Sequence, residues 1–120
     1  MFPRILRING TTRHDRLHVI GEINDVISVS GGWALDYKMF SNVSINILFE
    51  ISLRDVNRLL TEILKINVIL TSESISLLEE VTQKQAQLSE DAIFDIPGTL
   101  QITFIHNDPD MKIPVPPFNL

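Results

Sequence analysis

The sequence predicts a small α+β domain, a ferredoxin-like two-layer sandwich whose elements follow one another as β-α-β-β-α-β. An amphipathic helical repeat ends at Gly31-Gly32. The next two segments alternate apolar and polar residues with period two, which is typical of a hairpin with one buried face. A second helical repeat follows directly. We expect both helices to cover one face of a four-stranded antiparallel sheet.

The first half of the chain supplies the opening elements. Residues 4–8 are predicted as a strand, because an apolar-rich segment ends at the turn-forming pair Asn9-Gly10. Helical spacing of apolar residues then extends over 17–27. Residues 33–40 and 43–51 form the two arms of the hairpin.

The second half continues with a helix opened by a capping signal at Ser52 and a short buried strand over 68–71. Beyond them we expect a helix that begins near Ser76 and a last strand over 99–106. We therefore predict one domain over residues 1–120. Within it, 4–72 is the ferredoxin-like core, 73–106 is an appended helix and strand, and 107–120 is a proline-rich, extended tail.

Composition excludes several classes of protein. The chain has 120 residues and no cysteine, so it carries no disulfide framework, thiolate zinc site or cysteine nucleophile. Its net charge of −5 and 7% aromatic content argue against binding nucleic acid. It contains neither an apolar run of membrane-spanning length nor the apolar region of a signal peptide. We expect a cytoplasmic protein without nucleic-acid or membrane partners.

The middle of the chain carries a family resemblance. A helix stops at Gly31-Gly32, a strand opens with Gly32-Trp33-Ala34-Leu35-Asp36, and a second strand ends with Phe49-Glu50-Ile51. This run resembles ACT domains, small regulatory modules that bind amino acids or similar ligands, and the resemblance covers about residues 4–72. At the ligand turn, Asp15 is present but the family's Pro-Gly is absent. The resemblance implies a non-enzymatic regulatory homodimer that binds a small polar ligand such as an amino acid and needs no cofactor.

The candidate ligand-binding residues are Asn9, Gly10, Thr11, Thr12, His14 and Asp15. We expect this segment to lead from the edge of a strand into the N-terminus of a helix. Free amide donors and the positive end of the helix dipole could hold a carboxylate or phosphate there. The simpler interpretation, which we favour, is that Thr12 only caps the helix.

His14 and His18 lie one helical turn apart, a spacing that suits two metal ligands. His106 and Asp108 could add ligands if the last strand ends beside this helix. We favour two solvated histidines, because Leu17 rather than either histidine marks the apolar stripe. No triad, carboxylate pair or phosphate-binding loop stands out, so no catalytic residue is assigned.

Two other functions stay open. One is a small dimeric ferredoxin-like enzyme, metal-assisted through His14 and His18. The other is a plain protein-interaction module, because a sheet with helices on one face needs cover on the other. Trp33, the only tryptophan, is expected to be a core or interface anchor.

Overall fold

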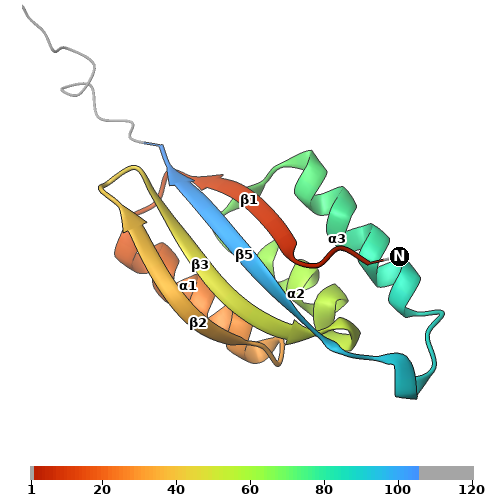
Figure 1. The fold of residues 1–120 in the computed structure, drawn as a ribbon. Helices are drawn as coiled ribbons and strands as arrows, with labels where there is room; N and C mark the ends of the chain where they lie inside the picture. The colour runs from red at the N-terminus through yellow and green to blue at the C-terminus, as the bar shows by residue number, and fades with distance from the viewer. Residues whose placement is uncertain (1, 106–120) are drawn as a thin grey trace, which may run out of the picture.

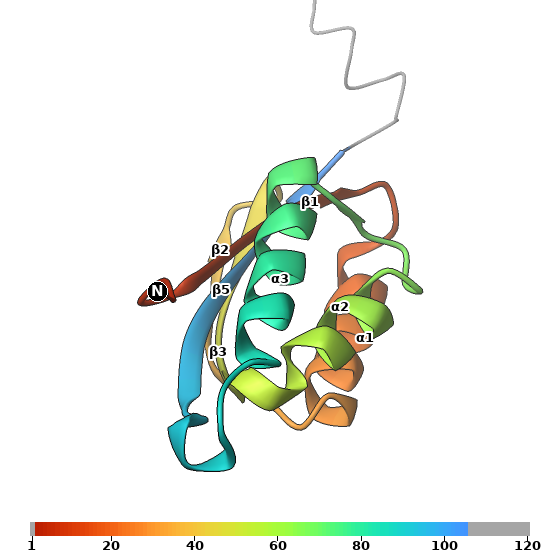
Figure 2. The same ribbon diagram turned by 90° about the vertical axis from the view of Figure 1, so that its right-hand side faces the viewer.

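A computed structural model describes residues 2–105, in which five strands form one sheet and three helices pack on one face of it (Figures 1 and 2). In chain order the elements are β1 (Leu6–Thr12), α1 (Arg16–Val29), β2 (Trp33–Phe40), β3 (Ser44–Ser52), α2 (Val56–Ile63), β4 (Ile69–Leu70), α3 (Ser72–Gln85) and β5 (Asp95–Phe104). Short 3-10 turns lie at Leu53–Asp55 and Glu90–Ala92. The predicted α+β class is confirmed. The expected tail over 107–120 lies outside the described residues.

The strand order is β2-β3-β5-β1-β4, which places β5 at the centre of the sheet. β5 is parallel to β1 and antiparallel to β3, and it pairs with both over most of its length. The order β-α-β-β-α-β is present as far as β4, but β5 separates β1 from β3. The strand predicted as an addition to a four-stranded core therefore joins the two halves of the sheet.

β1 does not end at Asn9-Gly10, as the sequence suggested, but continues to Thr12. Gly10 is buried opposite Leu70 of β4. A Cβ atom at Gly10 would lie 2.9 Å from the Val68 side chain and 3.0 Å from the Ile69 carbonyl oxygen. Glycine is needed here because β4 approaches β1 closely, not because the chain turns.

α1 ends as predicted. Its C-cap is Ser30, and Gly31 follows with a φ angle of +87°. The Gly31 N–H donates to the Ser28 carbonyl oxygen at 3.0 Å, and the Gly32 N–H donates to that of Ile27 at 2.9 Å. This pair of bonds is a Schellman motif, which directs the chain from α1 into β2.

Two elements in the second half begin several residues earlier than predicted. α3 begins after Thr71, whose side chain accepts a hydrogen bond from the Ser74 N–H, rather than near Ser76. β5 begins at Asp95 rather than at residue 99, and therefore includes Pro97 and Gly98.

One apolar core lies between the sheet and the helices. Its members come from every strand except β2 and from all three helices. Phe49 of β3 is 1% exposed and pairs with Gly98 of β5, so its ring covers the glycine. Within residues 2–105, no helix has both the length and the apolar character needed to cross a bilayer.

The two edges of the sheet differ in their protection. Along the β1 edge, the Asn9 N–H donates to the Ser74 hydroxyl at 2.8 Å, and the Thr71 N–H donates to the Asn9 carbonyl oxygen at 2.9 Å. The start of α3 therefore satisfies backbone groups that β4 is too short to reach. At the other edge, β2 is the outermost strand, and no further helix or strand of residues 2–105 lies beyond it (Figure 1).

Gly21 offers a test of whether α1 is a regular helix with an open surface at this position. It lies exposed within α1, and a Cβ atom there would meet no atom within 4 Å. We expect Gly21→Ala to raise the free energy of unfolding by about 0.5–1 kcal/mol, because alanine loses less backbone entropy in a helix. Urea denaturation followed by circular dichroism measures this change. A lower unfolding free energy would contradict an open, regular helix at this position.

Candidate functional site

The structure separates the predicted ligand-binding residues. Asn9, Gly10, Thr11 and Thr12 lie in β1 and not in a loop. Of the six, Thr12 and His14 line a surface hollow of about 270 Å³, which also involves Arg13 and residues 66–69. The other four do not line it.

Thr12 is 3% exposed and has a structural role different from the predicted helix cap. Its hydroxyl donates to the Asn67 carbonyl oxygen at 2.5 Å and accepts from the His14 N–H at 3.2 Å. These two bonds tie the end of β1 to the segment that enters β4. Thr12 is unavailable as a cap because it is committed to this contact before α1 begins.

Asp15 is the N-cap of α1. Its carboxylate accepts from the Leu17 N–H at 3.1 Å and from the His18 N–H at 3.2 Å. The amides expected to be free for a ligand are thus bound to a negatively charged side chain. An anionic ligand at this helix end would meet the Asp15 carboxylate, so the adjacent hollow near Arg13 suits a carboxylate better.

The two histidines are exposed, and their ring centroids lie 6.4 Å apart. His18 Nε2 also lies 3.8 Å from a Glu22 carboxylate oxygen. Across residues 2–105, no three His, Asp or Glu side chains are grouped so that they could hold a metal ion. β5 does end beside β1, since the Ile105 N–H donates to the Thr12 carbonyl oxygen at 2.8 Å, but His106 and Asp108 lie outside the described residues.

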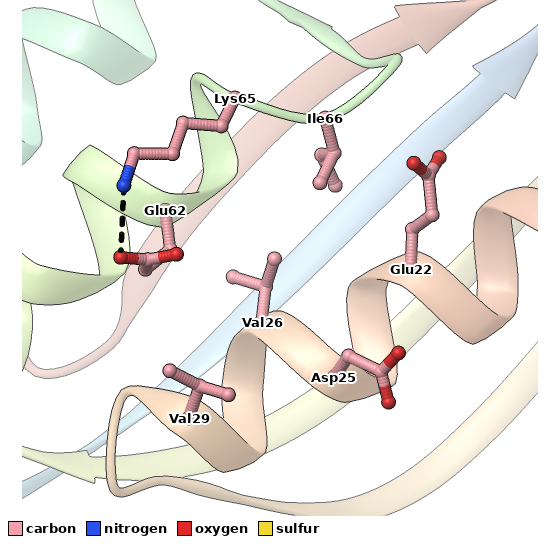
Figure 3. A pocket seen from close by; sticks show the side chains of 7 residues that line it. All are labelled: Glu22, Asp25, Val26, Val29, Glu62, Lys65 and Ile66. Carbon is pink, nitrogen blue, oxygen red and sulfur yellow. Dashed lines mark hydrogen bonds and ion pairs between the residues drawn. The ribbon is translucent and has the colours of Figure 1, made fainter.

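A second hollow of about 270 Å³ lies between α1 and α2 (Figure 3). Val26, Val29 and Ile66 supply its apolar lining. The remaining lining residues are charged: Glu22, Asp25, Glu62 and Lys65. Lys65 Nζ is 3.3 Å from Glu62, so the one cation of this lining is already paired with a carboxylate. The excess of acids disfavours an anionic ligand there.

The most distinctive surface was missed by the sequence analysis. Five apolar side chains of β2 are 40–51% exposed: Trp33, Leu35, Tyr37, Met39 and Phe40. We call this surface the β2 edge. The expectation that one apolar face of this hairpin arm is buried was wrong, and Trp33 is not a core residue.

Two features explain that error. A bulge between Ala34 and Asp36 shifts the register, so that Trp33 pairs with the half-buried Glu50 whereas Tyr37 pairs with the buried Ile47. In addition, β2 has a neighbour on one side only, so even its helix-facing residues are half covered. The apolar composition of β2 could have revealed this surface, but only if the sequence had shown that β2 is the outermost strand.

Two hollows flank the β2 edge where it meets α1. One, of about 450 Å³, is lined by Leu17, Ile20 and Met39 together with Arg16, Ser41 and Asn42. The other, of about 290 Å³, is lined by Trp33 and Tyr37 together with Asn24, Ile27, Ser28, Gly32 and Ala34. An apolar strand with hollows along one side offers contacts for an added strand and its side chains.

The chain matches no family model, no curated protein and no solved structure. The resemblance to ACT domains over residues 4–72 therefore stays a prediction.

Proposed function

We propose that this chain is a non-enzymatic interaction module that associates with another polypeptide strand through the β2 edge. The observation that carries this proposal is the set of five exposed apolar side chains on an outermost strand. Soluble proteins usually protect such edges, because unpaired backbone groups beside apolar side chains attract further strands. An added strand would satisfy both the backbone groups and the apolar surface.

The other edge of the same sheet supports this interpretation. There, the start of α3 takes up the Asn9 N–H and carbonyl oxygen. The fold thus protects the β1 edge and leaves the β2 edge open within the described residues. Lys38 and the bulge are both devices that discourage indiscriminate pairing, so the edge favours a specific partner.

The edge can be tested with a labelled peptide that has the sequence of residues 32–42. We expect saturable binding by fluorescence anisotropy at low protein concentration, because the peptide can pair with β2 as an added strand. A scrambled peptide of the same composition is the matched control. Equal binding of the two peptides, or binding of neither, would overturn the proposal.

A second candidate function is regulation by a small polar ligand, as the ACT resemblance implies. The hollow beside Thr12, Arg13 and His14 favours it, because it combines a cationic side chain with two of the predicted ligand residues. A homodimer of ferredoxin-like cores that senses an amino acid would combine both proposals. The Arg13 guanidinium would then recognise the ligand carboxylate.

This candidate predicts thermal stabilisation by at least one amino acid. A ligand at about 100 times its dissociation constant adds about 2.7 kcal/mol to the unfolding free energy, which shifts the melting temperature by several degrees. We expect Arg13→Ala to abolish the shift and Arg7→Ala, an exposed change near the start of β1, to preserve it. A panel of all amino acids without any shift would rule this candidate out.

A further inference from the structure

We propose that the partner of the β2 edge is a second copy of this chain, with the two β2 strands paired antiparallel about a two-fold axis at Tyr37. This inference rests on the proposed function of the edge. It would join two five-stranded sheets into one continuous sheet. Three observations lead to it: the directions of the backbone groups in β2, the order of its charges, and the distribution of its side chains between the two faces.

The backbone directions follow from the hairpin turn. The Phe40 carbonyl oxygen accepts from the Val43 N–H at 3.1 Å and therefore faces β3. Because these directions alternate along a strand, Lys38 also turns its N–H and C=O toward β3, whereas Tyr37 and Met39 turn theirs outward. In the single chain the Tyr37 N–H donates to the carboxylate of its neighbour Asp36 at 2.9 Å. Pairing of two β2 strands would replace this bond with one to a carbonyl oxygen of the other strand and release the carboxylate.

This alternation restricts how two β2 strands can pair. Outward-facing residues must lie opposite outward-facing residues, so the two-fold axis has to pass through a residue and not between two residues. Near the middle of β2 the choices are Asp36, Tyr37 and Lys38. Each choice gives a different set of residues opposite one another.

The charges select among these three positions. An axis at Asp36 places that carboxylate opposite its own copy, and an axis at Lys38 places two ammonium groups opposite each other. An axis at Tyr37 places Asp36 of each copy opposite Lys38 of the other. Opposite charges across an antiparallel pair stabilise it and like charges destabilise it, so the axis at Tyr37 is favoured.

The faces of the sheet agree with this choice. Asp36 and Lys38 lie opposite Leu48 and Asn46 of β3, on the face without helices. Tyr37 and Met39 lie opposite the buried residues Ile47 and Ile45, on the helix side.

Pairing at Tyr37 therefore brings the two tyrosines together on the helix side. At each end it places Leu35, the extra residue of the bulge, opposite Met39. The apolar layer beneath α1 would then continue from one copy into the other, and the two ion pairs would remain on the polar face. These contacts involve residues 35–39, and the side chains of all five are exposed in the single chain.

Charge exchange tests the register. In sedimentation equilibrium we expect the native chain to dimerise, and Asp36→Lys or Lys38→Asp to raise the dimer dissociation constant about tenfold or more, because each creates two like-charge pairs. The double variant, Asp36→Lys with Lys38→Asp, should restore dimerisation to within about threefold of the native constant. Glu79→Lys, an equal change of charge at an exposed residue of α3, should leave it unchanged.

Amide hydrogen exchange gives a second readout. The Tyr37 and Met39 amides should exchange more slowly as protein concentration rises, whereas the Lys38 amide, which already faces β3, should not change. A native chain that stays monomeric while the β2 peptide binds would overturn self-association but not the proposed function. A chain that neither dimerises nor binds the β2 peptide would overturn self-association and the proposed function together. If the native chain dimerises but the double variant does not, the two-fold axis does not lie at Tyr37.

Discussion

Replacement of Gly98 by valine is expected to leave the protein unfolded at room temperature, and replacement by alanine to destabilise it strongly. A Cβ atom at Gly98 would lie 2.4 Å from Cζ of Phe49 and no more than 3.0 Å from two further atoms of the ring. The ring is 1% exposed within the core, so it has no solvent into which it can move. Overpacking typically costs about 1–3 kcal/mol and occasionally more, and the 2.4 Å approach places Gly98 at the upper end, a large part of the stability of a small domain.

Thermal and urea unfolding of Gly98→Ala, beside Gly21→Ala as a control, measure this effect. The same substitution should destabilise at Gly98 and stabilise at Gly21, because only Gly98 has a ring above it. A double-mutant cycle with Phe49→Leu should show a coupling of about 1–2 kcal/mol, since the smaller side chain leaves room for the methyl group. An additive cycle would contradict the contact between Gly98 and Phe49.

The second large effect concerns β5. A chain that ends at Phe94, and therefore lacks β5, is expected not to fold. β5 supplies Ile96, Leu100, Ile102 and Phe104 to the core. Full burial of such side chains contributes about 1.5–3 kcal/mol each, so the loss of all four, about 6–12 kcal/mol, is comparable with the 5–15 kcal/mol that typically stabilises a domain. It would also leave the inner edges of β1 and β3 unpaired.

Proton–nitrogen correlation spectra and cooperativity of urea unfolding distinguish the outcomes. A chain that ends at Ile105 is the matched control, because it retains β5 and everything that packs around it in residues 2–105. We expect dispersed spectra from the control and collapsed spectra from the shorter chain. If a chain of residues 1–72 folded cooperatively, the predicted four-stranded core would be an independent unit and β5 would not be essential.

The sequence alone was sufficient where the structural signal is local. The Gly31-Gly32 stop of α1 is correct because a Schellman motif depends on two successive residues and the turn before them. The β2–β3 hairpin is correct because alternation and a short turn bring adjacent strands together. Ser52 was predicted to open the second helix. Its hydroxyl accepts from the Arg54 N–H and caps the 3-10 turn at Leu53–Asp55 instead, and α2 begins only at Val56. Each of these features is decided within about ten residues.

The candidate site was less predictable, because it depends on contacts between residues that are far apart in the sequence. Asp15 was identified as the acid before α1, but its use as a cap depends on Thr12 being held by Asn67, a residue far away in sequence. The β2 edge could not be recognised because exposure depends on which strand is outermost. The bulge at Leu35 then exchanged the faces of the residues on either side of it.

Pro97 shows what only the tertiary structure could decide. A proline beside a glycine predicts a loop, and on that basis β5 was expected to begin at residue 99. The Ile105 N–H faces β1, and by alternation the missing N–H of Pro97 would face the same side. Pairing with β1 begins only at Gly98, opposite Leu6, so Pro97 sacrifices no hydrogen bond in this sheet.

What the sequence determined by itself is therefore the set of elements, because helix stops, caps and alternation are short-range. The neighbours of each strand were decided by long-range contacts: β5 lies between β1 and β3 because Gly98 admits the Phe49 ring and because β4 is too short to serve as a full partner for β1. β2 pairs with β3 alone and lies at the margin of the sheet. Its apolar side chains therefore form the exposed surface through which we propose that the protein acts.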